Sequence, residues 1–321
     1  MKRAADAVSA RREVRVERRA GTAALARRIL KSKLIASTST AITMISVSTL
    51  TMLEYDSANR PPSVIDEFIQ LVRYRNLVFL LVENILKNRY KRSVLGIFWM
   101  LLNPLLQTIV LTIAFGTIFK SSLPNYAVYL LTGLLAWNFV TQTTQYAMST
   151  MAYGGGLLKK IYIPRATYIV AAVGNGLINL LVSIGSLVII IVFLAHPITL
   201  AWLFLPFSIL ILTIFALGFS LLLSTASVFF TDTIDIYQVL VQALFFLTPI
   251  MYPPSILPSE LAQLLGLNPF VILIEIFRAP IYDNHLPDFP LILNAVSLAL
   301  VTLAAGWILF TNRADQIAYR L

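Results

Sequence analysis

Long, uninterrupted apolar runs are the feature that most constrains this sequence. Several exceed about 20 residues, the length that a helix needs to cross the ~30 Å hydrocarbon core of a bilayer. In lipid, only helices and closed barrels satisfy the backbone polar groups, and these runs lack the alternation of barrel strands. The chain is also 58% hydrophobic and only 12% charged, against about 25% charged residues in soluble domains. The sequence therefore predicts an all-α, polytopic membrane protein.

Six transmembrane helices are predicted within a domain that covers residues 94–321. They lie at residues 94–119, 126–151, 166–194, 200–230, 236–251 and 290–310. The proline-rich segment 253–287 is too apolar for an ordinary outer loop and too interrupted for a span. It predicts two short helices, 261–267 and 269–277, that re-enter the outer leaflet, which is tolerated only where protein or water surrounds the backbone. A loop lying on the membrane surface is the alternative.

The N-terminal part is predicted to differ from the rest. Residues 1–60 read as a disordered basic tail, or as a leader translated from a start assigned too early, with Met44 or Met52 as the true beginning. An organellar transit peptide is disfavoured by the acidic residues near the start. Residues 61–93 predict an interfacial amphipathic helix on the membrane. Its alternative is a helix packed on a soluble partner.

Charge predicts the orientation. Four cations, Lys87, Arg89, Lys91 and Arg92, directly precede the first span and suit the anionic cytoplasmic headgroups. With both termini inside, the outer segments hold only Lys120 and Arg278, whereas all other Lys and Arg residues lie inside, in agreement with the positive-inside rule. The chain is therefore predicted to lie in the cytoplasmic (inner) membrane.

The overall charge of +10 does not indicate nucleic-acid binding. Eleven basic and three acidic residues within residues 1–33 account for +8 of it, and no basic face recurs downstream. The sequence has no cysteine, which excludes disulfides and thiolate metal sites.

No catalytic or metal site is predicted. Gly154, Gly155 and Gly156 are followed by Lys159 at the wrong spacing for a nucleotide-binding P-loop. His196 and His285 lack carboxylate partners at ligand spacing, and both are expected to be interfacial residues. No acid occurs between residues 94 and 230, although ion-coupled carriers usually bury one. Energy for any transport must therefore come from another subunit.

Three groups of residues are singled out as candidate sites. The cytoplasmic connection 154–165 places apolar residues beside lysines, as a segment that inserts into a partner's groove would; an ordinary positive-inside loop is the alternative. The re-entrant segment suggests a gate at the outer mouth, with Glu275 and Arg278 spaced to pair on one helical turn. Aromatic residues suit the apolar faces of sugar rings, or else the interfacial belt; the channel-lining candidates are Trp99, Trp137, Tyr146, Phe230 and Tyr237.

Three segments resemble the membrane subunit of type-2 ATP-binding-cassette exporters, and more narrowly exporters of O-antigen, capsule or teichoic-acid polysaccharide. They read YKRSVLGIFWMLLNPLL at 90–106, LLKKIYIPRATY at 157–168 and NPFVILIEIFRAPIYD at 268–283. The resemblance implies a homodimer with two separate ATP-binding subunits that hold ATP and Mg, so that this chain has no cofactor of its own. The substrate would be a lipid-linked glycan.

The resemblance also implies roles for particular residues. An ATPase-coupling loop would comprise Lys159, Lys160, Ile161, Tyr162, Ile163, Pro164 and Arg165. A cytoplasmic gate near the lipid headgroup would comprise Arg89, Tyr90, Lys91 and Arg92. An outer gate would include Asn268, Pro269, Glu275 and Arg278. Two other hypotheses remain open: a type-2 exporter of drugs or lipids, and a membrane-embedded enzyme acting on lipid-linked sugars.

Overall fold

The computed structural model describes residues 63–119, 125–153, 164–256 and 268–320, together with 258, 260, 265 and 266. The predicted tail 1–60, most of the coupling loop and most of the helix predicted at 261–267 lie outside these residues. Throughout the described part the regular structure is helical, which confirms the all-α prediction. The α-helices are α2 (Ser63–Arg73), α3 (Arg75–Tyr90), α4 (Phe98–Phe119), α5 (Tyr126–Tyr153), α7 (Ala166–Phe193), α8 (Leu205–Phe229), α9 (Thr233–Leu247), α11 (Pro269–Arg278) and α12 (Phe289–Arg320).

Four segments are long and apolar enough to cross a membrane. They are Phe98–Thr117, Ala166–Phe193, Leu200–Phe229 and Phe289–Ala314, and they correspond to the first, third, fourth and sixth predicted spans. The fifth prediction was wrong in extent, because α9 has 15 residues and ends at Leu247. At 1.5 Å per residue it is about 22 Å long. Pro249, which cannot donate a backbone hydrogen bond, follows directly.

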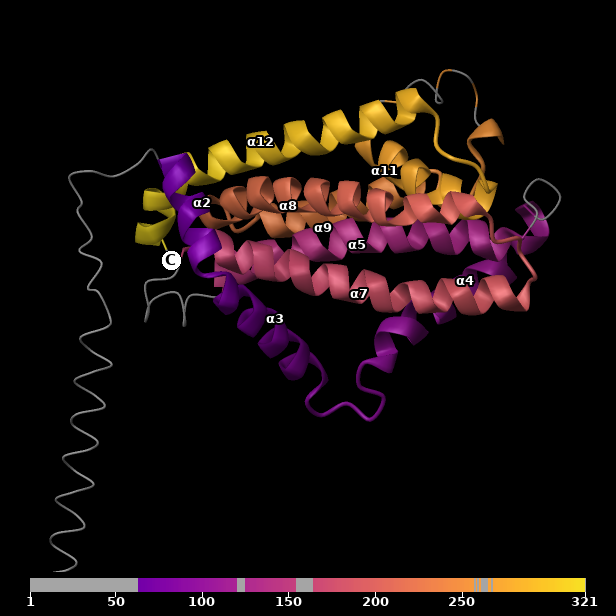
Figure 1. Ribbon diagram of the computed structural model, residues 1–321, viewed down its shortest axis with the longest axis horizontal. Helices are drawn as coiled ribbons and strands as arrows, with labels where there is room; N and C mark the ends of the chain where they lie inside the picture. Colours follow the sequence, from indigo (N-terminus) through magenta and orange to yellow (C-terminus); the bar gives the residue numbers. More distant parts are fainter. Residues whose placement is uncertain are drawn as a thin grey trace, which may run out of the picture. The chain divides into compact units, whose positions relative to one another are not determined.

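Helix α5 is the centre of the bundle, and this position accounts for its polarity. Nineteen of its 28 residues are buried, and it packs against α4, α7, α8 and α11 (Figure 1). Buried hydroxyls bond within the helix, as when Thr141 donates to the Trp137 carbonyl at 2.8 Å. At about 42 Å it is long enough to cross a bilayer, but protein rather than lipid surrounds much of it.

Two glycines allow α8 and α12 to pack closely along much of their length. A Cβ atom built on Gly218 would lie 2.4 Å from the Leu303 backbone, and one on Gly306 would lie 2.2 Å from the Gly218 carbonyl oxygen. Both distances are far below van der Waals contact, so the crossing requires glycine on both helices.

Substituting Gly218→Ala is therefore expected to destabilise the protein by about 1–3 kcal/mol, the usual cost of overpacking. The melting temperature of the purified protein in detergent checks this. Gly116→Ala is the matched control, because a Cβ there would meet its nearest neighbour, Thr112 Cγ2, at an ordinary 3.5 Å. Equal melting temperatures for the two variants would contradict the close crossing.

Both the N-terminal helix and the start of the first span differ from the prediction. It is broken at Tyr74, whose φ of −91° and ψ of 17° leave the helical region, so that α2 and α3 are separate helices. The first span begins at Phe98 rather than at residue 94, because Gly96 adopts a left-handed φ of +51°. Ser93 Oγ accepts the Gly96 N–H at 3.0 Å and stabilises this turn. A sharp connection therefore joins α3 to α4.

The outer segment contains the predicted short helix α11. Asn268 caps its start by accepting the Phe270 N–H at 3.0 Å, and Pro269 occupies the first turn, where no N–H is needed. The chain then makes one π-helical turn, Ala279–Asp283, before α12 begins. Both elements pack against α5.

Candidate functional site

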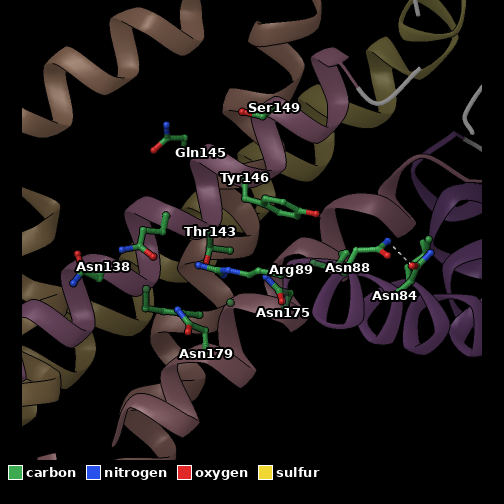
Figure 2. A pocket seen from close by; sticks show the side chains of 15 residues that line it. Asn84, Asn88, Arg89, Asn138, Thr143, Gln145, Tyr146, Ser149, Asn175 and Asn179 are labelled. Atoms are coloured by element: carbon green, nitrogen blue, oxygen red, sulfur yellow. Dashed lines mark hydrogen bonds between the residues drawn. The ribbon is translucent and has the colours of Figure 1, made fainter. Parts of the chain in front are cut away.

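Polar hollows surround the middle of α5. The first has a volume of about 590 Å³ and is walled by α3, α5 and α7. In Figure 2, Arg89 extends from α3 toward Thr143 of α5, with Asn175 and Asn179 of α7 beside it. On the α3 wall, Asn88 Nδ2 donates to Asn84 Oδ1 at 2.6 Å.

A second and a third hollow, each about 450 Å³, continue from the first. The second shares Arg89, Gln142 and Asn179 with it and extends toward α4. The third lies between α4, α5 and α9. Asn138 lines all three hollows, and its Nδ2 lies 3.4 Å from Gln107 Oε1, as a donor to it. We refer to these three hollows, which share Asn138 as a lining residue, as the polar path around α5.

The lining is rich in side-chain amides and poor in charge. Carboxamides come from every wall: Asn84, Asn88, Asn103, Gln107, Asn138, Gln142, Gln145, Asn175, Asn179, Gln238 and Gln242. Among the described lining residues none is acidic, and Arg89 is the one cation. Each carboxamide offers two donors and an acceptor without a charge. Such a surface suits neutral, hydroxyl-bearing groups.

Two atoms in the first hollow have unused bonding capacity. Thr143 Oγ1 and Asn175 Oδ1 are buried and have no hydrogen-bond partner among the described residues. Leaving such an atom unsatisfied costs about 1–3 kcal/mol. Gly176 permits this arrangement, because a Cβ at that position would lie 2.0 Å from Thr143 Oγ1. Gly176 thus allows α7 to pack closely against α5 here.

The predicted gate residues lie at one mouth of this path. Arg89 and Tyr90 line the second hollow. Lys91 and Arg92 join Arg89 in an adjoining open hollow of about 440 Å³. Arg89, Lys91 and Arg92 thus place three cations next to the amide-lined walls, and their role as a gate stays a prediction.

The predicted channel-lining aromatic residues lie in different surroundings. Tyr146 lines the first hollow, Trp99 the second and Trp137 the third. Trp137 is itself only 4% exposed. Tyr237 is similarly buried, at 6% exposed, and its hydroxyl donates to the Thr141 carbonyl at 3.1 Å. Phe230, at the end of α8, is 72% exposed and lines none of the described hollows.

The predicted outer-gate residues do not form the pair expected of them. Glu275 is exposed, whereas Arg278 is only 7% exposed and turns inward. Arg278 Nη1 donates to the Pro249 carbonyl at 3.1 Å, and the guanidinium carbon lies 3.7 Å from the centre of the Tyr129 ring. Asn268 donates to Thr248 Oγ1 at 2.9 Å. Arg278 and Asn268 thus tie α11 to the end of α9.

Of the predicted coupling residues, Lys159, Lys160, Ile161, Tyr162 and Ile163 lie outside the described residues. Pro164 and Arg165 directly precede α7. The Arg165 guanidinium donates to the Ala314 carbonyl of α12.

Most of the amide lining was not predicted from the sequence. The span at 126–151 is visibly polar in the sequence, but nothing in the sequence alone joins Asn84, Asn88, Asn175 and Asn179 to it. A signal was present: Asn84 and Asn88, and likewise Asn175 and Asn179, are four residues apart and share a helix face. The same holds for Asn138 and Gln142.

Residues 76–282 match the ABC-2 type transporter family. The chain belongs to this family. The matched region contains every residue that lines the three hollows but excludes α2 and α12. As an ABC-2 membrane subunit, the chain is a permease of the kind that pairs with ATP-binding subunits.

Curated relatives are similar over most of the chain. The O-antigen export system permease protein RfbA of Myxococcus xanthus is 29% identical over 251 residues, which cover 78% of this chain and 96% of that protein. A Klebsiella pneumoniae protein of the same name is 28% identical over 208 residues, 63% of this chain and 79% of its own. The polysialic acid transport protein KpsM of Escherichia coli is 26% identical over 239 residues, 72% and 91% of the two chains.

Proposed function

We propose that this ABC-2 permease exports a lipid-linked polysaccharide of the O-antigen or capsule type across the cytoplasmic membrane. Two copies would assemble with two ATP-binding subunits, which hold ATP and Mg. The observation that carries the proposal is the amide-lined, acid-free path around α5. Similarity to O-antigen and polysialic acid export proteins supports the same substrate class.

The lining residues would bind different parts of the substrate according to their chemistry. The guanidinium of Arg89, with Lys91 and Arg92 beside it, would bind the phosphate of the lipid carrier through charge-assisted hydrogen bonds. The carboxamides would exchange hydrogen bonds with sugar hydroxyls. Tyr146, Trp99 and Trp137 would pack on the apolar faces of the sugar rings.

Weak, exchangeable contacts are what a conduit requires. A chain of sugars must leave each position as easily as it enters. Neutral hydrogen bonds contribute only about 0.5–1.5 kcal/mol each, so no single position would hold a sugar tightly. The described residues offer no acidic relay in the apolar spans, and the driving energy would come from ATP hydrolysis in the partner subunits.

The orientation follows from where the exposed cations lie. Arg165 directly precedes α7 and donates to the Ala314 carbonyl in the last part of α12, next to the exposed Arg313. At the opposite end, Arg278 is bonded internally and is not an exposed loop charge. Both termini and the coupling loop would therefore be cytoplasmic. In this topology α5 and α9, the latter extended by residues 248–251, complete six membrane crossings.

Deleting the gene is expected to abolish surface polysaccharide and to leave lipid-linked polymer inside the cell, with wild-type drug tolerance. Immunoblotting of surface and total polysaccharide checks this, with the plasmid-borne gene as complementation. Loss of drug tolerance with intact polysaccharide would instead indicate a drug exporter. Turnover of lipid-linked sugars by the purified chain alone would indicate an enzyme.

A further inference from the structure

The carboxylate of Glu67 joins two helices that are about a hundred residues apart in the sequence. Glu67 lies on α2, and its Oε1 accepts the backbone N–H of Ala166, the first residue of α7, at 3.1 Å. The first N–H groups of a helix have no partner within the helix, and they form its positive end. Arg165, the residue before α7, makes no capping hydrogen bond with its own side chain. Glu67 therefore supplies a capping bond from another helix.

The same helix is also fixed to α12. Trp307 Nε1 donates to the Val64 carbonyl at 3.1 Å, and the Trp307 ring packs edge-on against Phe68 with centroids 6.3 Å apart. Arg165 completes the set by donating to Ala314 of α12. Three segments, α2, the start of α7 and the end of α12, thus meet at one end of the bundle (Figure 1).

From this junction, α2 leads directly to the polar path. After the break at Tyr74 the chain continues as α3, which packs along α7 and contributes Asn84, Asn88 and Arg89 to the first hollow. A displacement of the α7 start would move α2 with it for as long as the Glu67 bond holds. The α3 wall, including its cation, would then shift relative to α5.

We propose that Glu67 is a positioning residue: it transmits movement of the chain before α7 to the α3 wall of the first hollow and so couples ATP hydrolysis to export. The inference rests on the proposed export function, because it needs an ATP-binding subunit that moves the loop ending at Arg165. Glu67 lies outside the segment that matches the transporter family. The positioning role is therefore inferred from the contacts of Glu67 in this structure.

Burial raises the pKa of Glu67 above its ordinary value, although the Ala166 N–H partly opposes the shift. A raised pKa means that the ionised form is disfavoured in the folded protein, so ionisation at neutral pH reduces stability. Glu67→Gln removes that cost and keeps a carbonyl oxygen that can accept the Ala166 N–H. The Gln variant should therefore fold at least as well as the natural protein.

The test measures polysaccharide exported per ATP hydrolysed, in proteoliposomes that contain the permease, its ATP-binding subunit and lipid-linked polysaccharide. Glu67→Ala is expected to lower this ratio about tenfold, within the usual range of coupling between sites, while ATP hydrolysis continues. Glu67→Gln should retain most of the coupling. Glu83→Ala is the matched control, because Glu83 is an exposed acid on α3 that pairs with Lys87.

Three results would overturn the inference. The ratio could be unchanged in Glu67→Ala. Export, ATP hydrolysis and melting temperature could fall together in that variant, which would indicate a purely structural role. Glu67→Gln could lose as much coupling as Glu67→Ala, which would exclude the hydrogen bond as the cause. Failure of the proposed function itself is distinguishable, because the natural protein would then export no polysaccharide.

Discussion

Replacing Arg278 by methionine is expected to lower the melting temperature of the purified protein by about 6–12 °C. Arg278 is nearly fully buried, donates to the carbonyls of Pro249 and Ile250, and covers the ring of Tyr129. Hydrogen bonds from a charged group contribute about 1.5–3 kcal/mol each, and a desolvated cation–π contact about 2 kcal/mol. The desolvation cost of the buried guanidinium offsets part of this.

The free energy of unfolding therefore falls by about 3 kcal/mol. For a chain of this size each kcal/mol lowers the melting temperature by about 2–4 °C. The Ile250 carbonyl would lose its arginine donor, and the Pro249 carbonyl would keep only the Tyr129 hydroxyl as a side-chain donor, at 3.2 Å, at the point where α9 has ended and α11 must be held. Methionine can fill the space but cannot donate.

Two variants make the result specific. Glu275→Gln, on the same helix, changes an exposed acid and is expected to melt close to the natural protein. Arg278→Lys keeps the charge but not the planar group that reaches both carbonyls, so it should be intermediate. If Arg278→Met melted at the natural temperature, the guanidinium would not be what holds α11 against α9.

Replacing Arg89 by alanine is expected to reduce the export rate about 10–100-fold at low substrate concentration. The reduction corresponds to the loss of a charge-assisted bond to phosphate worth roughly 1.5–3 kcal/mol. Arg89 is the single cation among the described residues that line the first and second hollows. No other side chain there can replace it.

The measurement is transport of lipid-linked polysaccharide into inverted vesicles over a range of substrate concentrations. Arg89→Lys should be intermediate, because an ammonium is a point charge without the two-pronged geometry of a guanidinium. Lys87→Ala is the matched control: Lys87 is on the same helix, pairs with Glu83 and lines none of the described hollows. Equal losses in Arg89→Ala and Lys87→Ala would show that general positive charge, rather than Arg89, serves the substrate.

The long helices could be predicted from the sequence, and some of their limits to within a residue. Helix α7 was predicted at 166–194 and is Ala166–Phe193, and the start of α5 was placed correctly at Tyr126. A long apolar run has one low-energy form in a bilayer, and its limits are the polar or proline residues in its own sequence. The cluster of Arg89, Lys91 and Arg92 could also be read from the sequence, because charge next to an apolar run is a local signal; its role as a gate stays a prediction.

Features that depend on contacts between distant segments were decided by the tertiary structure. Arg278 was expected to pair with Glu275, its neighbour on the same helix. It binds instead to carbonyls 28 and 29 residues away and to Tyr129. The early end of α9 and the break at Tyr74 belong to the same class, since each precedes a segment that packs elsewhere in the bundle.

The amide-lined path also depends partly on local sequence and partly on contacts between distant segments. The sequence alone determined that this is a helical membrane protein without an acidic relay and with cations beside its first span. Only the packing of α3, α4, α7 and α9 around α5 brought the carboxamides together, and only the fold placed Glu67 at the start of α7. A hydrophobic span is a property of consecutive residues, whereas a binding surface is a property of residues that meet from different helices.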